Sequence, residues 1–245
     1  MICSLFKRGK TLKQFKIETH LHTTYASKCG WLGAEPILRD YAEAGYDAIC
    51  ITDHFNRTTF EYLDIDITHP ENNLPGLDIV HEFLIGYRRI KQAAEKYGIL
   101  VYEGAELRFD GSESDYLFYG FKHETLRDPE TIISSGLEAF VKRYRSEDPD
   151  AFLLQAHPFR PKCTPADPSL LDGVEVFNAS PRHNSDNPSA LAYAKKYGMI
   201  MTAGSDAHRP GDNGKAGILT DTLPADSKEF AALLRSGNFT IFHEE

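Results

Sequence analysis

Short apolar runs typical of β-strands alternate with amphipathic runs typical of helices along most of this sequence. The strand-like runs include "FKIETHLH", "DAICITDH", "ILVYEGAEL", "AFLLQAHP", "GVEVFN" and "MIMTAGSDAH". Helix-like runs such as "AEPILRDYAEAGY", "TIISSGLEAFVKRYR" and "PSALAYAKKYG" lie between them. Repeated strand–helix units predict an α/β fold in which helices pack around a mostly parallel sheet or barrel.

The length of 245 residues suits a single domain of this kind. No linker, internal repeat or low-complexity run divides the chain. We therefore predict one domain over residues 1–245, with a core over about 15–222 and a final helix and strand within 226–245.

The segment 55–76 is rich in turn-forming and aromatic residues and is longer than an ordinary connection. We interpret it as a candidate lid in which Phe60, Tyr62 and His69 contact an organic leaving group. The alternative is that this segment only packs over one end of the barrel.

The composition argues against two classes of partner. A formal net charge of -9 and a pI near 5.6 do not suit an extended nucleic-acid or membrane-surface binder. No apolar run approaches the length of a membrane span, and "MICSLFKRGK" does not resemble a secretory signal. The cysteines form no C-x-x-C pair, which predicts reduced thiols and a cytoplasmic protein. They are Cys3, Cys29, Cys50 and Cys163.

Polar residues suited to bind divalent metals follow the carboxyl ends of the strand-like runs. They are His20, His22, Asp53, His54, Glu106, His157, Asn178, Asp206 and His208. In a barrel of strand–helix units these ends meet on the face where sites are built. A structural role would explain any one histidine, but His20 and His22 lie two residues apart, and Asp206 and His208 repeat this spacing. Convergence of so many donors favours a metal site.

Three acids near these motifs have competing interpretations. Glu18 aligns with His20 and His22 if the strand continues, which predicts that it accepts an imidazole N–H, although it could merely be solvated. Glu106 is interpreted as a carboxylate that bridges two cations, or as an exposed acid beside a glycine turn. Glu103 is its rival for the bridging role.

The motifs "HLH", "ITDH", "GAEL", "QAHP" and "GSDAH" occur in this order between about Ile17 and His208. The ordered set resembles the PHP (polymerase and histidinol phosphatase) family. This resemblance implies a distorted (β/α)7 TIM-like barrel, a centre of two or three divalent cations at its C-terminal face, and phosphoester hydrolysis. The implied ligands are His20, His22 and Asp206 for the first cation, Glu106 as a bridge, His157 and His123 for the second, and His54 and His208 for the third.

The sequence departs from the family pattern at two places. His123 is included because "GFKHE" resembles a family "GFHE" with one inserted residue; the alternative is an exposed loop histidine. The third cation normally gains a His or Asp about six residues after the first motif, where this chain has Lys28 and Cys29. A protonated lysine cannot ligate a cation, and a cysteine thiolate would be unusual there. The third position is therefore expected to be empty, weak, or completed by water or another residue.

The expected function is hydrolysis of a small phosphorylated metabolite or nucleotide by a hydroxide that bridges two cations. Arg160 is interpreted as a fork for phosphoryl oxygens or as a surface charge, with Lys28 and Asn178 as further substrate contacts. Asp206 or His208 would protonate the leaving alkoxide. Mixed imidazole and carboxylate ligands suit zinc, manganese or iron and do not select among them.

Three other functions remain open. An amidohydrolase-like enzyme would act on C–N bonds, but no clear candidate for a bridging lysine stands at a strand end. A catalytically impaired metal-binding regulatory module would explain Lys28. A nuclease is disfavoured by the acidic charge balance. The sequence leaves the physiological substrate and the oligomeric state open.

Overall fold

The computed structural model describes residues 13–244, so the predictions made for the amino-terminal "MICSLFKRGK", including Cys3, lie outside the described residues. The strands are β1 (Phe15–Glu18), β2 (Ala48–Ile51), β3 (His54–Phe55), β4 (Leu100–Arg108), β5 (Asp115–Tyr119), β6 (Phe152–Gln155), β7 (Gly173–Asn178), β8 (Ile200–Gly204), β9 (Ala216–Thr220) and β10 (Thr240–His243). The helices are α1 (Ala34–Glu43), α2 (Arg57–Tyr62), α3 (Ile79–Phe83), α4 (Ile85–Ala94), α5 (Pro129–Glu147), α6 (Asn187–Tyr197) and α7 (Ser227–Ser236). Short 3-10 helices are η1 (Pro70–Asn72), η2 (Glu95–Tyr97), η3 (His123–Leu126) and η4 (Pro168–Leu170).

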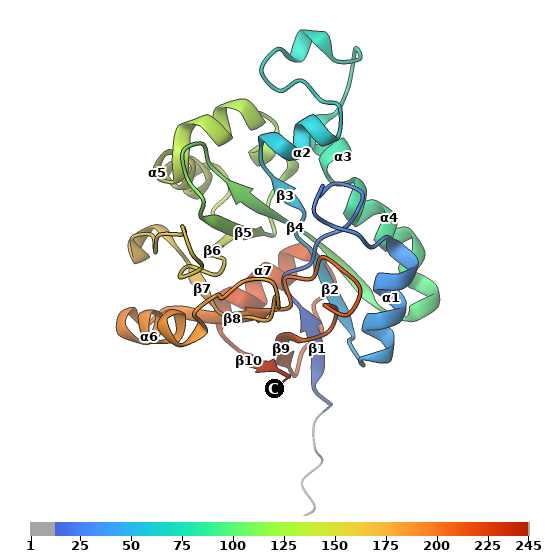
Figure 1. Cartoon of the computed structure of the whole chain (residues 1–245), viewed down its shortest axis with the longest axis vertical. Coiled ribbons are helices and arrows are strands. Elements are labelled where there is room, and N and C mark those ends of the chain that lie inside the picture. The colour runs from blue at the N-terminus through green and yellow to red at the C-terminus, as the bar shows by residue number, and fades with distance from the viewer. Residues whose placement is uncertain (1–12, 245) are drawn as a thin grey trace, which may run out of the picture.

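The strands form one curved sheet in the order β10-β9-β1-β2-β4-β5-β6-β7-β8, with β3 paired to β4 (Figure 1). A parallel bridge between Leu21 and Ala207 and a hydrogen bond from Thr19 Oγ1 to Ala203 O (2.8 Å) bring the two sides together. The sheet is therefore a nearly closed barrel, and the predicted α/β barrel architecture is confirmed.

Eight strands run in the same direction, whereas β5 and β9 run against them. The connection 109–114 between β4 and β5 is too short for a parallel crossover, so these strands form a hairpin. Consequently β5 begins at the end of the barrel where β4 finishes. This reversal decides which residues reach the candidate site.

The amphipathic run after residue 76 forms the two helices α3 and α4, which are divided at Leu84. Helix α4 approaches the barrel closely at Gly86, where a Cβ atom would lie 2.1 Å from Asp53 Oδ2. Gly98, at φ 66°, ends the helical run in the left-handed conformation. The region thus positions Asp53, which follows β2.

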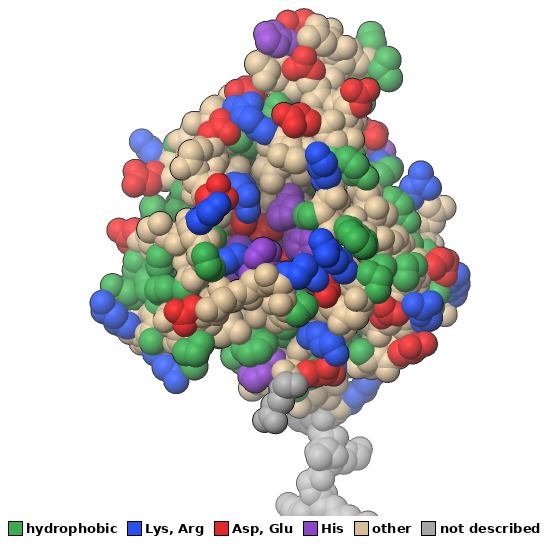
Figure 2. All heavy atoms as spheres, in the orientation of Figure 1, with side chains coloured by type: hydrophobic (Ala, Val, Ile, Leu, Met, Phe, Trp, Pro, Cys, Tyr) green, Lys and Arg blue, Asp and Glu red, His purple; other side chains and the backbone are tan. Residues whose placement is uncertain are grey.

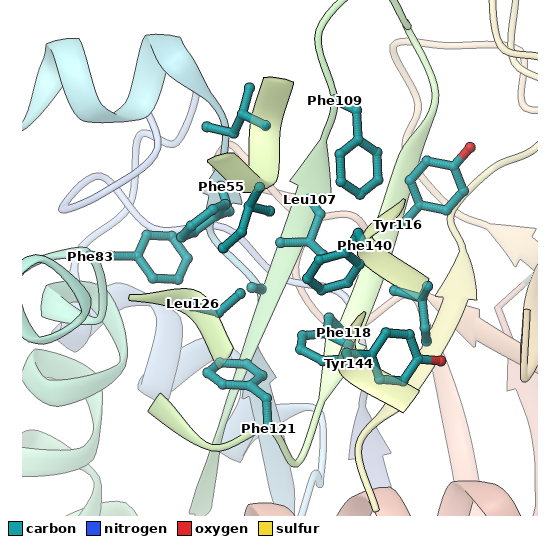
Figure 3. Close-up of a cluster of buried hydrophobic side chains, with 14 of the residues drawn as sticks. Phe55, Phe83, Leu107, Phe109, Tyr116, Phe118, Phe121, Leu126, Phe140 and Tyr144 are labelled. Carbon is teal, nitrogen blue, oxygen red and sulfur yellow. The ribbon is translucent and has the colours of Figure 1, made fainter. Parts of the chain in front are cut away.

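A large cluster of buried hydrophobic side chains, many of them aromatic, is shown in Figure 3. It joins β3, β4 and β5 to α2, α3 and α5. Phe60, predicted to contact a leaving group, is fully buried there, with ring centroids 5.0 Å from Phe55 and 6.3 Å from Phe83. That prediction is wrong, because the first apolar side chains of the segment pack inward against β3 and α3.

The remainder of the segment 55–76 projects from the barrel at the top of Figure 1. Arg57 anchors its base through ion pairs with Asp110 (2.7 Å) and Glu130 (2.6 Å). Tyr62 donates a hydrogen bond to Thr24 O (2.9 Å), whereas His69 lies exposed in the projecting part. Within residues 13–244, no helix combines the length and apolarity needed to cross a bilayer.

Candidate metal centre

Four side chains converge near the carboxyl ends of β1, β4 and β8. The Nε2 atoms of the buried His20 and His22 lie 3.1 Å apart. Each lies 3.2 Å from an oxygen of Glu106 and 3.4 Å from Asp206 Oδ1. Donor atoms in tetrahedral coordination at about 2.1 Å from zinc are roughly 3.4 Å apart, so this set has the spacing of a cation site. We call it the first position.

Glu175 on β7 orients His20. Its Oε1 lies 2.9 Å from His20 Nδ1, and its Oε2 accepts hydrogen bonds from His157 N (3.0 Å) and Asn178 Nδ2 (2.9 Å). A carboxylate at Nδ1 favours the tautomer in which Nε2 keeps its lone pair for a cation. Glu175 was not predicted from the sequence, where its only signal is an acid in the apolar run "GVEVFN".

That orienting role was predicted for Glu18, and this prediction is wrong. Strand β1 ends at Glu18, so the alternation of side chains does not continue to His20. The Glu18 carboxylate instead accepts hydrogen bonds from the backbone amides of Thr19, His20 and Ser205 and from the Tyr41 hydroxyl. Burial raises its pKa. Glu18 therefore holds the backbone below the histidines.

Strand β8 passes very close to the same point at Gly204. A Cβ atom there would lie 2.5 Å from His20 Cβ and 2.9 Å from Glu175 Oε1. Two residues later, Asp206 has a φ of 48°, a backbone conformation that is uncommon for a residue other than glycine. These features turn the Asp206 carboxylate toward the histidines.

His157 and Asp115 form a second group of donors with Glu106. His157 Nε2 lies 3.2 Å from Glu106 Oε1 and 3.8 Å from Asp115 Oδ2, and all three side chains are buried. Arg108 pairs with both oxygens of Asp115 at 2.6 Å. We call this group the second position. Asp115 was missed because it starts a strand whose direction is not visible in the sequence.

His123, the predicted second ligand at this position, lies elsewhere. Strand β5 runs away from the site, so His123, which begins η3 beyond its far end, is carried to the opposite end of the barrel. Its side chain is 52% exposed, and its Nε2 lies 3.2 Å from Glu103 Oε2. The assignment of His123 as a ligand is therefore wrong, and Glu103 does not rival Glu106.

A third group consists of His22, His54 and His208. The His22 ring centroid lies 4.3 Å from that of His54 and 4.2 Å from that of His208. The His208 Nδ1–H donates to Asp206 O (2.9 Å), which leaves its Nε2 available. His54 and His208 side chains are 17% and 14% exposed, unlike the donors of the first position. We call this group the third position.

Lys28 and Cys29 lie beside the third position and line the same cavity as His54 and His208. Desolvation raises the pKa of the Cys29 thiol, but contacts with the His208 and His54 imidazoles lower it to about 5.

Arg160 and Asn178 lie behind Asp206. Arg160 Nη2 donates to Asp206 Oδ2 (2.6 Å) and to Asn178 Oδ1 (3.1 Å). Asn178 Nδ2 donates to Asp206 Oδ2 (3.2 Å) as well as to Glu175. The amide of Asn178 is therefore engaged by protein groups, whereas Arg160 also lines the cavity.

Four of the donors line a cavity of about 480 Å³, namely His54, Asp115, Asp206 and His208. Figure 2 shows histidine side chains in a hollow near the centre of this face, with Lys and Arg side chains around it. Lys28, Arg108, Arg160 and His183 are among the lining residues. The cavity wall of this acidic protein therefore carries cationic side chains.

The electrostatics of the donors suit positive charge. Burial raises the pKa of Glu106 and Asp206, but the neighbouring imidazoles, His20 first, lower both well below their ordinary values. Burial lowers the pKa of His20 and His54, but nearby carboxylates raise both well above 6.5. Among the described residues, Glu106 Oε2 and His157 Nδ1 are buried without a hydrogen-bond partner. The donor set therefore fits divalent cations.

Comparison with solved structures identifies the fold. PsfC from Pseudomonas syringae is 20% identical with a TM-score of 0.63, and the match covers 95% of this chain and 92% of PsfC. A Bacteroides vulgatus protein, described as a two-domain protein containing a predicted PHP-like metal-dependent phosphoesterase, is 18% identical with a TM-score of 0.62. That match covers 95% of this chain and 65% of the other. Endonuclease Q, solved with a 27-mer duplex carrying an abasic lesion, is 13% identical with a TM-score of 0.60, over 91% of this chain and 57% of the other.

No curated protein has significant sequence similarity to this chain. Family comparison is more specific. Residues 184–239 match the family described as PHP-associated. Residues 18–199 match the PHP domain, and this match includes both histidine motifs at the ends of β1 and β2, as well as Glu106 and His157. Because that match covers most of the sequence, the chain belongs to the PHP domain family.

Proposed function

We propose that this protein is a metal-dependent phosphoesterase that hydrolyses a small phosphorylated metabolite or nucleotide at a centre of two or three divalent cations. The observation that carries the proposal is the arrangement of charge in the cavity. Two carboxylates, Glu106 and Asp206, join three groups of imidazoles at the floor. Cationic side chains line the wall above them. The floor suits cations, and the wall suits phosphoryl oxygens.

Each cation would be bound by a different set of side chains. The first position would use His20, His22, Glu106 and Asp206, the second Glu106, His157 and Asp115, and the third His54 and His208 beside His22. Imidazole and carboxylate donors suit zinc, manganese or iron. When bound, the cations supply Lewis acidity, which lowers the pKa of water and withdraws charge from phosphoryl oxygens.

The side chains of this chain position the substrate. Arg160 projects into the cavity while one of its nitrogens holds Asp206 Oδ2, so it would bind a phosphoryl oxygen and keep the carboxylate in place. Lys28 and Arg108 would contact the remaining oxygens. Asn178 is assigned to the orientation of Asp206 and Glu175.

The leaving alkoxide requires a proton. Asp206 is poorly suited to give one, because its pKa is lowered and both of its oxygens face cationic or hydrogen-bonding groups. His208 is the better donor in a state in which its Nε2 carries no cation, since its Nδ1 is engaged by Asp206 O.

We further propose that the substrate is a small molecule. Asn56, Thr58 and Thr59, at the start of the segment 55–76, line the cavity, so we retain this segment as a wall or lid over the substrate. The structure solved for endonuclease Q holds duplex DNA, and a duplex therefore belongs among the substrates tested. The net charge of -9 favours a small anion over an extended nucleic acid.

The test combines metal analysis with a substrate screen. Elemental analysis of the purified chain should find at least two equivalents of zinc, manganese or iron. His20→Ala and Asp206→Ala should reduce this content and the activity on nucleotides, sugar phosphates, histidinol phosphate, phosphotyrosine or duplex DNA. His123→Ala is the matched control, because it removes an exposed imidazole at the far end of the barrel. Failure to take up any metal on reconstitution would instead indicate a binding or regulatory module.

A further inference from the structure

Among the described residues, the third position has no carboxylate of its own, whereas the first position has Asp206 and the second has Asp115. His54 and His208 face it, but His22 Nε2 is shared with Glu106 and Asp206 of the first position. Glu106 Oε2, almost fully buried and without a hydrogen-bond partner in the described part of the chain, lies 2.7 Å from His54 Nδ1. The position therefore has two imidazoles, and the Glu106 carboxylate is directed toward it. Among the carboxylates of residues 13–244, it has no anionic ligand of its own.

The loop after His22 is held at two points on either side of Cys29. On one side, Ser27 Oγ donates to Asp53 (2.7 Å) and accepts from His54 N (3.1 Å). On the other, Trp31 N donates to His208 O (2.8 Å). The loop is thus tied by hydrogen bonds to the two segments that carry the two histidines.

The tight turn of this loop directs Cys29 to the same place. Gly30 N donates to Ser27 O (2.9 Å), and a Cβ atom at Gly30 would lie 2.4 Å from Thr23 O. Only glycine allows so close an approach. Cys29 therefore lines the same cavity as His54 and His208.

We propose that Cys29 is a ligand of the third cation together with His54 and His208. This rests on the proposed function, since it assigns a ligand within the same centre. Ligation replaces the S–H bond with a sulfur–metal bond and releases the thiol proton to solvent. A thiolate with two imidazoles selects zinc, iron(II) or cobalt(II) over magnesium, calcium or manganese. Lys28 then remains free to contact the substrate.

The other cysteines provide controls. Cys50 is buried in β2, away from solvent. Cys163 is the closest rival, because its thiol raises the pKa of His157 of the second position and donates to Glu113 O. Cys163→Ser is therefore the matched variant, and Cys3→Ser covers the cysteine outside the described residues.

Cobalt(II) is the probe. The full chain, treated with a chelator and then titrated with cobalt(II), is followed by bound equivalents and by the near-ultraviolet thiolate-to-cobalt charge-transfer band. We expect the band in the wild type, Cys163→Ser and Cys3→Ser. Cys29→Ser should lose the band and one bound equivalent, and Cys29→Asp should regain the equivalent without the band.

A second readout needs no variant. Iodoacetamide alkylation of the wild type, analysed by peptide mass spectrometry, should modify Cys29 in the metal-free chain and spare it after cobalt loading. Persistence of the band in Cys29→Ser, or its absence from a wild type that binds two or more equivalents, would overturn the ligand assignment and leave the phosphoesterase proposal standing. A wild type that binds no cobalt at all would overturn both.

Discussion

The first and third positions use the same kinds of residue but hold them differently. At the first position His20 and His22 are fully buried, and Glu175 and Gly204 fix His20 from behind. At the third position His54 and His208 are partly exposed, and the neighbouring side chains come from a loop. Ligands at strand ends are thus held in place by buried contacts. A loop, by contrast, allows different residue types beside the third position.

The largest test of this contrast compares His20→Ala with His54→Ala. Removing a buried ligand of the first position should lower kcat/KM about 100- to 1000-fold, because cation chemistry contributes several kcal/mol. His54→Ala should cost less, because the third position is partly exposed. Steady-state kinetics on the substrate found in the screen, with metal content measured in parallel, gives both values. Equal losses would remove the distinction between the two positions.

The metal-free protein should depend on pH in a direction set by the imidazoles. Burial lowers the pKa of His157, but contacts with Cys163 and Glu106 raise it from 6.5 to about 9. A raised folded-state pKa gives stabilisation that is complete below pH 6.5 and lost as the pH rises through 9. The loss should be roughly 3 kcal/mol in the free energy of unfolding.

Urea unfolding in the presence of a chelator, at several pH values in this range, measures that loss. The metal-loaded protein is the control, and its stability should fall less or rise, because cations bind the deprotonated imidazoles. A chelated protein whose stability does not fall over this range would contradict the assigned charge network.

Glu175→Gln tests the orientation of His20 at the first position. The substitution removes the carboxylate charge behind Nδ1 and should weaken metal affinity about 10- to 100-fold. Glu103→Gln is the control, because Glu103 contacts only the exposed His123 among the histidines described. Competition with a chromogenic chelator measures both affinities. Equal affinities in the two variants would show that Glu175 does not orient the ligand.

The smallest effect is expected at the loop. Lys28→Ala should raise KM for a phosphorylated substrate about two- to fivefold with kcat nearly unchanged, because an exposed ion pair contributes about 0.5–1 kcal/mol. Lys28→Arg, which keeps the charge, should restore the wild-type KM. An unchanged KM in Lys28→Ala would remove this lysine from the substrate site.

The contrast between the two positions also separates what the sequence could predict from what it could not. Motifs at the ends of parallel strands were predictable, because strand period and chain direction place such residues on one face. His20, His22, Glu106, His157 and Asp206 lie together for this reason. The departure at Lys28 and Cys29 was also visible in the sequence.

Errors arose where the chain leaves that regular pattern. Glu18 was misassigned because β1 ends before His20, so alternation no longer applies. Phe60 was misassigned because its ring is buried against Phe55 and Phe83 and does not face the site. Periodicity predicts the face of a residue only while the strand or helix continues.

The sequence by itself determined the fold family, the strand-end histidines and the place of Glu106 among them, because these depend on local pattern and order along the chain. Tertiary structure decided that Asp115 faces the centre and His123 does not, because β5 runs antiparallel to β4. It also decided that Glu175 orients His20 across the barrel. Contacts between distant strands depend on strand direction and barrel closure, which no short stretch of sequence encodes.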